Sequence, residues 1–472
     1  MIDGSGFATI SEVAPLLARR ELSAVELTRH CLDRIDRYDA AIHAFITPTP
    51  ELALAHAERT DREIASGDYR GPLHGVPFAL KDVFETAGTR TTGGSMAFSS
   101  NVPSIDATLV QRLHAAGAIL LGKTSTHELT YGGVDLAAGF PPARNPWDTD
   151  RDPGGSSSGS AAAIAAGFCL AALGTDTGGS VRLPAGLCGV VGLKPTYGRT
   201  SRRGVMLNSH SLDHCGPMTW TVGDCALVLQ AIAGHDPADP ASVDQPVPDF
   251  SAALGRDLRG IRIGVVRHFY ERDVPAGKQA QAAMEDALGM LRYAGAELCA
   301  VNLRPLQEYA EHKVTVQLPE IFTVYGAEVR RRPEAFGPKF RQRIATGDRV
   351  SAVDYIRAQQ IRREMTTEMA SVMSGLDALV TCGAYAPAPR LDDVAAEAMP
   401  NKPEITVPFS MTGFPALSIC IGFSAEGLPF AMQIAGRRFD ETNVLRIADA
   451  YERATPWRAR RPALDAARTI PE

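Results

Sequence analysis

The sequence predicts an α/β protein: a single large α/β/α domain in which a central, mixed and twisted sheet is covered by helices on both faces. Helix-like and strand-like segments alternate along most of the 472 residues, which is typical of layered α/β folds. Short apolar runs that resemble buried strands are scattered from residue 76 to residue 434, and the simplest arrangement places them in one sheet. We therefore expect residues 1–472 to form one domain.

The first segment, about 1–65, is expected to be helical. Ser23 and Glu26 form an S-x-x-E capping box, which marks the start of a helix. Apolar residues then recur every four positions from Leu27, and this spacing predicts a helix that ends near Tyr38.

Alternating strands and helices continue through about 66–235, which we expect to form the core of the domain. Apolar runs predict strands over 76–80, 118–121 and 169–173. Helices are predicted over 108–116, where Gly117 ends the helix, and over 161–166, where every side chain is small or apolar.

The second half of the chain repeats the pattern and adds a long, arginine-rich helical region. The predicted elements are, in order, a proline-rich loop at 237–248, a β-α-β unit at 261–303, helices within 305–375, a strand at 376–382 and a hairpin made of 416–423 and 429–434. Asp440 is expected to cap a last helix that runs to about Arg453.

Charge and composition exclude several classes of protein. Lys+Arg 48 against Asp+Glu 54 give a net charge of −6, and no basic stripe of the kind that binds nucleic acid is present. Residues 153–175 carry no charge, but their apolar part, 161–173, is too short to cross a bilayer. The eight cysteines are scattered without a CxxC pair, and no signal peptide is evident. We expect a cytoplasmic protein with reduced thiols and with neither a nucleic-acid nor a membrane partner.

Three short segments carry residues that are suited to chemistry. They are His74–Asp82, which contains Lys81; Pro153–Ala163, which contains Ser156; and Gly174–Arg182, which contains Ser180. A lysine at the end of an apolar strand can be desolvated, and desolvation favours the neutral amine that can act as a base. Alone, Lys81 could equally pair with Asp82, and Ser156 could be a simple helix cap.

The third segment is rich in glycine around Ser180. Glycines allow consecutive backbone N–H groups to turn toward one point, which is the geometry of an oxyanion hole beside a nucleophile. Phosphate binding needs a similar loop, but the G-x-x-x-x-G-K-[ST] pattern is missing. Taken by itself, the segment could also be an ordinary turn.

Together the three segments resemble the amidase signature family. Its glycine- and serine-rich region is matched by Gly154–Ala163 and Asp176–Arg182, and its strand lysine by Gly75–Asp82. The resemblance continues through Gly189–Gly198, Ser211–Pro217 and Pro408–Gly436, so it covers nearly the whole chain. It implies an amidase, a hydrolase of linear amides or other carbon–nitrogen bonds that needs no cofactor.

The resemblance also implies a role for each site residue. Ser180 would be the nucleophile, Lys81 the base and Ser156 the bridge between them, with a cis peptide between Gly155 and Ser156. The backbone N–H groups of Thr177, Gly178, Gly179 and Ser180 would form the oxyanion hole.

Other residues are candidates for substrate binding or for support of the site. Tyr131, Gly155 and Phe322 are candidate substrate-binding residues, and Tyr325, Met399 and Phe409 could extend an apolar pocket or belong to the core. Asp176 and Arg182 flank the nucleophile, and we interpret them as a polar pair that fixes the loop. No metal-ligand pattern is present.

A histidine-based mechanism is the main alternative for the base. His74, His210 and His214 lie in segments that look like loops, and no strand pattern leads into the G-x-S-x-G match at Gly155–Gly159. The sequence therefore favours Lys81 over a histidine.

The family also includes the A subunit of the tRNA-dependent amidotransferase, which releases ammonia from glutamine for partner subunits. The chain departs from that pattern at Pro403, where an acidic residue is expected, and at Ile321–Glu328, where a Tyr-Asp-Gly segment is missing. Arg362 could match an arginine that binds the substrate carboxylate. The region therefore looks more like that of stand-alone amidases.

The substrate is expected to be a small or medium, largely uncharged amide or carbamate, with its fit set by the variable region of about 305–410. A carbamate- or hydrazide-specific hydrolase is an open alternative, as is a non-catalytic binding protein, although intact Lys81, Ser156 and Ser180 argue against the latter. A homodimer is possible.

Overall fold

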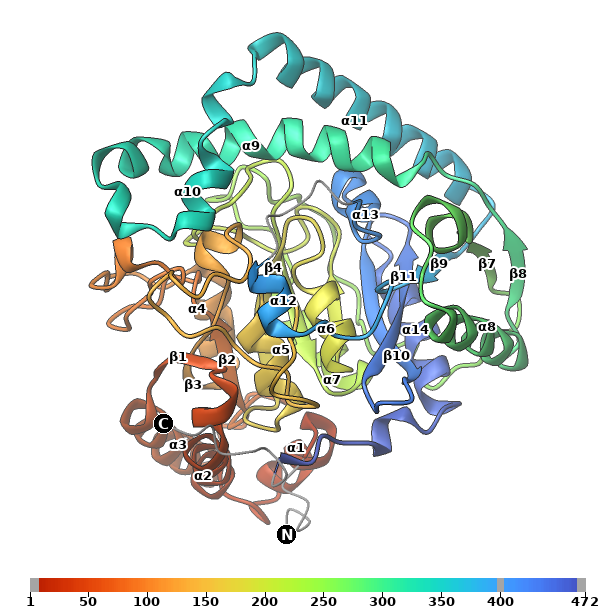
Figure 1. Ribbon diagram of the computed structural model, residues 1–472. Helices are drawn as coiled ribbons and strands as arrows, with labels where there is room; N and C mark the ends of the chain where they lie inside the picture. Colours follow the sequence, from red (N-terminus) through yellow and green to blue (C-terminus); the bar gives the residue numbers. More distant parts are fainter. Residues whose placement is uncertain (1–7, 397–402, 465–472) are drawn as a thin grey trace.

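The computed structural model describes residues 8–396 and 403–464, and its centre is one mixed sheet (Figure 1). The sheet has 11 strands in the order β1-β3-β2-β4-β6-β5-β10-β11-β9-β7-β8. The strands are β1 (Phe45–Pro48), β2 (Pro77–Lys81), β3 (Ile119–Thr124), β4 (Ala171–Asp176), β5 (Val191–Lys194), β6 (His214–Thr219), β7 (Arg262–Val265), β8 (Glu297–Ala300), β9 (Ala378–Cys382), β10 (Ala416–Phe423) and β11 (Pro429–Gly436). The predicted α/β class with a central mixed sheet is confirmed.

Parallel and antiparallel pairs occupy different parts of the sheet. Strand β2 runs parallel to β3 and β4, and β7 runs parallel to β8 and β9. The remaining pairs are antiparallel, including the hairpin of β10 and β11.

Fourteen α-helices lie in the described part of the chain. They are α1 (Ile10–Ala18), α2 (Ala24–Ile42), α3 (Pro50–Ala65), α4 (Thr108–Ala115), α5 (Ser158–Ala165), α6 (Arg182–Cys188), α7 (Val222–Ile232), α8 (Lys278–Tyr293), α9 (Leu306–Arg331), α10 (Pro338–Ile344), α11 (Ala352–Met373), α12 (Leu391–Ala396), α13 (Val407–Thr412) and α14 (Glu441–Arg453). None of the helices in 8–396 and 403–464 is both long and apolar enough to span a bilayer.

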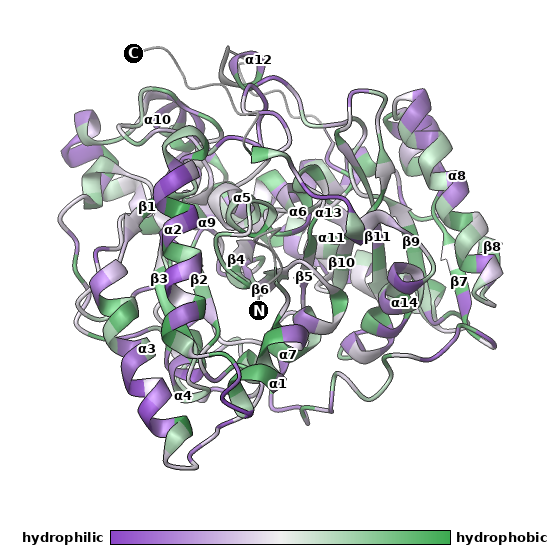
Figure 2. Cartoon of the chain, turned by 90° about the horizontal axis from the view of Figure 1, so that it is seen from below, coloured by the Kyte–Doolittle hydropathy of each residue, from purple (hydrophilic) through white to green (hydrophobic). Residues whose placement is uncertain are grey.

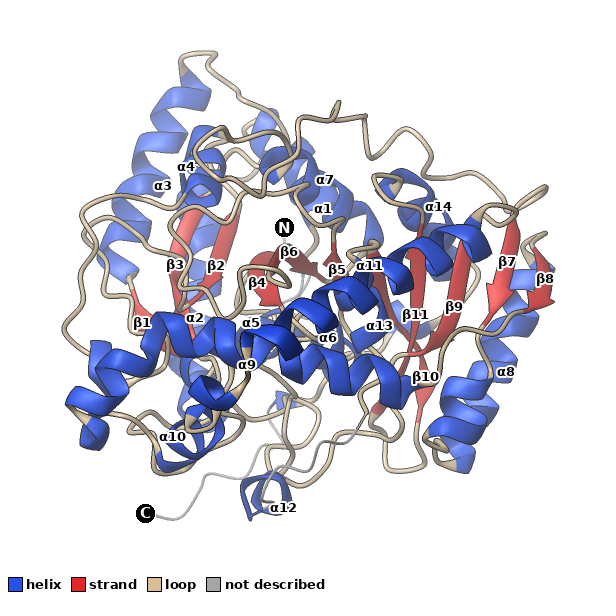
Figure 3. Ribbon diagram, turned by 90° about the horizontal axis from the view of Figure 1, so that it is seen from above, coloured by secondary structure: helices blue, strands red, loops and turns tan. Residues whose placement is uncertain are grey.

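The helices form layers around the sheet. Helix α5 packs on α6 over the middle strands of the sheet, and α7 packs on α14 over the same strands. Two pairs of helices therefore cover the central strands. Figure 2 shows the contrast between outer helices such as α3 and α8, which alternate hydrophilic and hydrophobic residues, and the paler central helices. Helices α9 and α11 run side by side across the molecule when it is seen from above (Figure 3).

Most of the predicted elements are confirmed, with small shifts of their ends. Both halves of the capping box at Ser23 and Glu26 form, although the helix continues to Ile42 instead of ending near Tyr38. Gly117 ends α4 in a left-handed conformation with φ 80°. The free cysteines are buried as expected, except Cys299, which is exposed.

Three strands and one helix cap depart from the predictions. The sequence patterns predict none of β1, β5 and β6, and His214, expected in a loop, is the first residue of β6. The sequence pattern does not predict β6 because the strand contains Gly216 and Pro217, and both residue types are rare in central strands. Glycine is needed at 216 since a Cβ would collide with the carbonyl of Leu193. Asp440 stands at the N-cap position of α14, but its side chain makes no capping hydrogen bond.

The sheet brings two of the three candidate segments to the same edge. Lys81 is the last residue of β2, and Asp176 is the last residue of the neighbouring parallel strand β4. Carboxyl ends of parallel neighbours meet at one edge of a sheet, which is where α/β proteins usually bind ligands. The lysine and the loop that carries Ser180 are therefore adjacent although they lie far apart in sequence.

Candidate active site

Lys81 is buried at the centre of the site and is bonded to Ser156. Its Nζ donates hydrogen bonds of 2.7 Å to Oγ of Ser156 and to Oγ1 of Thr175. The side chain of Lys81 is 0% exposed and Ser156 is 2% exposed. Burial lowers the pKa of Lys81 to about 7, although the charges of Asp213 and Asp176 oppose this shift. A large fraction of Lys81 is therefore a neutral amine near neutral pH.

Ser156 lies in the turn that precedes α5, where the chain passes beneath His127. The Gly155–Ser156 peptide is cis, as the family resemblance implies. A Cβ at Gly155 would collide with the imidazole ring of His127, so glycine is required there. Burial lowers the pKa of His127 to about 3, which keeps the ring neutral. The N–H of His127 donates to the carbonyl of Ser156 at 3.3 Å and fixes this turn.

Ser180 lies at the opening of the site and is half-buried. The carbonyl of Ser180 accepts a hydrogen bond from the N–H of Ser157 at 3.1 Å, which ties the two serine segments together. No hydrogen bond joins the hydroxyls of Ser156 and Ser180 within the described residues. Such catalytic contacts often tighten only when substrate is bound.

The loop before Ser180 presents unpaired backbone donors. Among the residues that the structure describes, the N–H groups of 177–180 have no hydrogen-bond acceptor. The carbonyl of Gly178 accepts from Oγ1 of Thr406 at 2.6 Å, which holds it away from the N–H side. Gly179 has φ 144°, a conformation that favours glycine, and a Cβ there would collide with Thr406. Unpaired N–H donors in such a loop are what the predicted oxyanion hole would need.

Asp213 anchors the other end of this loop. Its Oδ1 accepts from Oγ1 of Thr177 at 2.6 Å, and its Oδ2 accepts from the N–H groups of Asn208 and Ser209 at 2.7 and 2.9 Å. Although burial raises its pKa, these donors favour the carboxylate.

Asp176 and Arg182 form a buried ion pair beside the loop that carries Ser180. The guanidinium of Arg182 donates to both carboxylate oxygens of Asp176 at 3.0 Å, and to the carbonyl of Thr406 and Oε1 of Gln433 at 2.8 Å. Burial alone would raise the pKa of Asp176, but Arg182 holds it below its usual value. These partners lie at the end of β4, just before α13 and in β11, which fits a supporting role.

No histidine takes the place of Lys81 in the described residues. His74 faces Glu63, 3.0 Å away, His210 is exposed, and Nδ1 of His214 lies 2.6 Å from the carbonyl of Leu212. None of the three has a hydrogen bond to Ser156 or Ser180.

The candidate substrate-binding residues are divided between the site and the core. Gly155 is half-buried near Ser180, whereas Tyr131 lies beneath Arg343, whose guanidinium is 5.4 Å from the ring centroid. Phe322 packs in a separate hydrophobic cluster. That cluster contains Ala97, Leu129, Ile321, Tyr325, Phe336, Phe340 and Ile344, with Tyr131 and Phe322 at its edge.

The other residues that the sequence suggests for substrate binding do not line the site in the described part of the chain. Phe409 is fully buried in α13, and Met399 lies outside the described residues. Nε of Arg362 donates to the carbonyl of Met411 at 2.8 Å, and Nη2 donates to that of Ser211 at 2.7 Å. Its guanidinium thus joins α13 to the segment that precedes β6.

Sequence reasoning missed three residues at the site, Thr175, His127 and Thr406, and considered Asp213 only beside His214 in the histidine-based alternative. Thr175 stands in the third segment and Asp213 in the matched Ser211–Pro217 stretch, so both lie within motifs that the sequence already marks. His127 lies four residues before Tyr131, while Thr406 has no motif that would draw attention to it.

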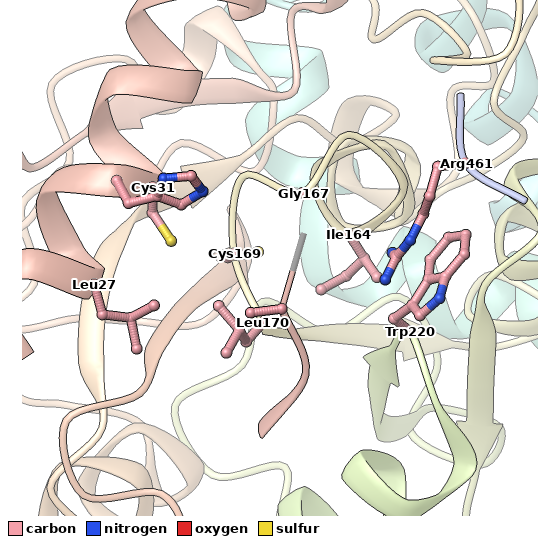
Figure 4. A pocket seen from close by; sticks show the side chains of 10 residues that line it. Leu27, Cys31, Ile164, Gly167, Cys169, Leu170, Trp220 and Arg461 are labelled. Carbon is pink, nitrogen blue, oxygen red and sulfur yellow. The ribbon is translucent and has the colours of Figure 1, made fainter. Parts of the chain in front are cut away.

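Away from this site the structure has a small hollow (Figure 4). It is lined by apolar side chains that include Leu27, Ile164, Leu170 and Trp220, with Arg461 stacked 3.5 Å from the Trp220 ring centroid. None of its lining residues belongs to the three candidate segments. Within the described residues, no three His, Cys, Asp or Glu side chains gather as a metal site would require.

Comparisons with known proteins agree on one family. Residues 26–445 match the family model described as Amidase. The chain is 41% identical over 486 residues to the A subunit of the glutamyl-tRNA(Gln) amidotransferase of Chloroflexus aggregans, and the alignment covers 97% of this chain and 98% of that protein.

Solved structures are also similar over nearly the whole chain. The peptide amidase of Stenotrophomonas maltophilia has a TM-score of 0.84 and 33% identity, over 96% of this chain and 98% of the other. A protein from a complex called vestigial, whose structure is described as revealing the evolutionary origins of an s-triazine catabolic enzyme, has a TM-score of 0.89 and 33% identity. That alignment covers 94% of this chain and 98% of the other.

Proposed function

The chain belongs to the amidase family of carbon–nitrogen hydrolases, and from this premise we propose that it cleaves a linear amide-type bond through an acyl-enzyme on Ser180. The products are a carboxylic or carbamic acid and ammonia or an amine. In this proposal Lys81 is the base and Ser156 carries protons between Lys81 and the reacting atoms.

The observation that carries the proposal is the buried contact between Lys81 and Ser156. A distance of 2.7 Å allows a proton to pass directly between Nζ and Oγ. The absence of solvent around both side chains favours the neutral amine, which is the form that can accept this proton.

The reaction begins with the transfer of two protons. Neutral Lys81 takes the hydroxyl proton of Ser156 while Ser156 takes that of Ser180, whose Oγ attacks the amide carbonyl. Lys81 is now an ammonium, and the carbonyl oxygen carries the negative charge. The unpaired N–H groups of 177–180 stabilise this oxyanion.

The same protons return when the intermediate collapses. Ser156 donates its proton to the leaving nitrogen and is reprotonated by Lys81, so the carbon–nitrogen bond breaks and Lys81 is neutral again. Water then attacks the acyl group on Ser180, with its proton taken up through Ser156, and the acid is released. Each step uses only groups of this chain, the substrate and water.

A second candidate function is that of the glutamine-hydrolysing component of a tRNA-dependent amidotransferase. The observation in its favour is the 41% identity to the amidotransferase protein of Chloroflexus aggregans over almost the full length of both chains. Pro403 and the helical course of Ile321–Glu328 within α9 argue for a stand-alone enzyme, because both differ from the pattern expected of that component.

Hydrolysis by the protein purified alone tests both functions. We would assay p-nitroanilides, primary amides including glutamine, and aryl carbamates with the wild-type protein and with Ser180→Ala. Hydrolysis by the wild type that Ser180→Ala abolishes supports the proposal, and unchanged hydrolysis in the variant contradicts it. Activity on glutamine alone, raised by added partner proteins, would favour the second candidate.

A further inference from the structure

Helix α9 crosses above the loop that carries Ser180 and places one lysine on it. The side chain of Lys313 reaches Gly178, because a Cβ added at Gly178 would lie 2.9 Å from both Cε and Nζ of Lys313. On the same side, Cγ2 of Val407 would be 3.8 Å from that Cβ. The absence of a side chain at Gly178 is therefore what leaves room for the end of Lys313.

Lys313 lies on the face of α9 that packs against the rest of the protein, so its side chain points toward the loop. Ala310, Val316 and Gln317, which lie three or four residues away and share its face, are all buried against the rest of the protein. Lys313 itself is half-buried, so its stem covers the loop while its ammonium stays near the opening.

The ammonium of Lys313 has no counter-ion among the described residues. The two acidic residues nearest to it along α9 are Glu311 and Glu308, and both are bonded elsewhere. Glu311 accepts from Gln307 at 2.8 Å, and Glu308 pairs with Arg304 at 3.4 Å. Lys313 lies in the first third of α9, far from Arg330 and Arg331 in its last turn.

The two buried carboxylates beside the loop are engaged by other groups. Asp176 is paired with Arg182, and Asp213 is fully engaged by Thr177 and two backbone N–H groups. A lysine that faces a loop of unpaired N–H donors creates a region of positive potential, which is complementary to a negatively charged ligand.

We propose that Lys313 binds an anionic group of the substrate, so that the enzyme prefers amides that carry a carboxylate close to the scissile bond. This inference rests on the proposed function and names the substrate class more closely. It replaces our sequence-based expectation of a largely uncharged substrate. Lys313 would be a specificity-determining residue that contacts the substrate beside the oxyanion hole.

An alternative role for Lys313 makes a different prediction. If its charge stabilised the oxyanion directly, removing it would slow the hydrolysis of neutral and charged amides by the same factor. If it binds a substrate carboxylate, removing it would slow the hydrolysis of the charged amides only. A comparison of isosteric substrates therefore separates the two roles.

The test uses pairs of amides in which a carboxylate replaces an isopropyl group of the same shape. Malonamate, succinamate and glutaramate are compared with 3-methylbutanamide, 4-methylpentanamide and 5-methylhexanamide. For at least one pair we expect wild-type kcat/KM to be higher for the carboxylate. Lys313→Met should lower kcat/KM for that carboxylate by about 10- to 100-fold, the usual effect of losing a hydrogen bond to a charged group, and leave its neutral partner within about twofold.

Two further variants control for charge and folding. Lys313→Arg keeps the charge and should retain most of the preference for the carboxylate. Lys278→Met makes the same substitution at an exposed lysine at the start of α8 and should change neither substrate. Equal losses for charged and neutral amides in Lys313→Met, or a wild type that prefers every neutral partner, would overturn the inference.

A binding measurement keeps this test separate from the proposed function. Malonate, succinate and glutarate, the products of the three charged amides, are titrated by calorimetry into Ser180→Ala and into Ser180→Ala/Lys313→Met. Binding of one dicarboxylate that weakens about tenfold or more in the double variant supports the role of Lys313. Equal binding contradicts it. If no amide is hydrolysed, the proposed function fails, and this titration still decides the role of Lys313.

Discussion

Oγ of Ser156 lies 2.7 Å from Nζ of Lys81, and both side chains are shielded from solvent. Groups that pass protons to one another act as a unit, so their losses should not add. We expect Lys81→Ala and Ser156→Ala each to lower kcat by roughly 10³-fold or more. The double variant should be nearly as active as the weaker of the two, which steady-state kinetics with an activated anilide would measure.

A matched control for these variants is present on the neighbouring strand. Lys123 in β3 is also buried, and its Nζ donates to Oγ1 of Thr91 at 2.6 Å, away from the two serines. Lys123→Met should lower the melting temperature but retain hydrolysis in the protein that remains folded. Losses in Lys81→Ala and Ser156→Ala that multiply in the double variant would contradict a shared relay.

The pH dependence follows from the lowered pKa of Lys81. Burial brings this pKa from 10.5 to about 7, and the active form is the neutral amine. The rate therefore falls as pH drops through about 7 and levels off at higher pH. A profile of kcat/KM for an uncharged amide, from about pH 5.5 to about pH 9.5, measures this fall in rate. A rate that keeps rising to a midpoint near the ordinary lysine pKa of about 10 would mean that Lys81 is not desolvated as we describe.

The charge of Asp213 should affect the midpoint of this pH profile. Its carboxylate raises the pKa of Lys81, so Asp213→Asn should move the midpoint of the pH profile to lower pH. Thr177→Val removes the 2.6 Å hydrogen bond to Asp213 but leaves the charge. This variant should lower kcat without moving the midpoint. An unshifted midpoint in Asp213→Asn would show that Asp213 acts only as an anchor.

Thr406 should affect catalysis through the shape of the oxyanion loop. Its hydroxyl donates to the carbonyl of Gly178 at 2.6 Å, so Thr406→Val releases the loop. We expect kcat to fall by roughly tenfold with little change in KM, less than the loss of an oxyanion donor itself. Thr412 is the control, because its hydroxyl donates to Pro408 within the same helix at 2.8 Å. If Thr412→Val slowed the enzyme as much, the effect would come from α13 and not from the loop.

The fold is predictable to the extent that its strands follow the usual apolar pattern. Strands β2, β4, β9, β10 and β11 are buried, mostly apolar runs, and the sequence predicts each of them. Strand β6 contains Gly216 and Pro217. Glycine at 216 is required by the close approach of Leu193 in β5, and such a contact is invisible in the sequence.

The candidate site is predictable where its residues fall within contiguous motifs. Lys81, Ser156 and Ser180 each lie in a short segment with its own pattern, so the family resemblance could identify them. Thr406 lies 228 residues from the Gly178 carbonyl that it holds. Lys313 reaches Gly178 from a helix whose polar pattern looks like that of a solvated surface. Contacts of this kind depend on how α9 and α13 fold over the sheet.

Capture of the acyl-enzyme tests the central claim most directly. The wild type is mixed with an aryl carbamate, whose carbamoyl group passes to the serine as the bond from the carbonyl carbon to the aryl oxygen breaks and the phenol leaves. The mixture is quenched in acid during turnover and digested for mass spectrometry, because carbamoyl groups leave serine slowly. The account predicts one carbamoyl group on Ser180 and none on the Ser180→Ala protein. Turnover with the modification on another residue, or turnover that continues in Ser180→Ala, would contradict it.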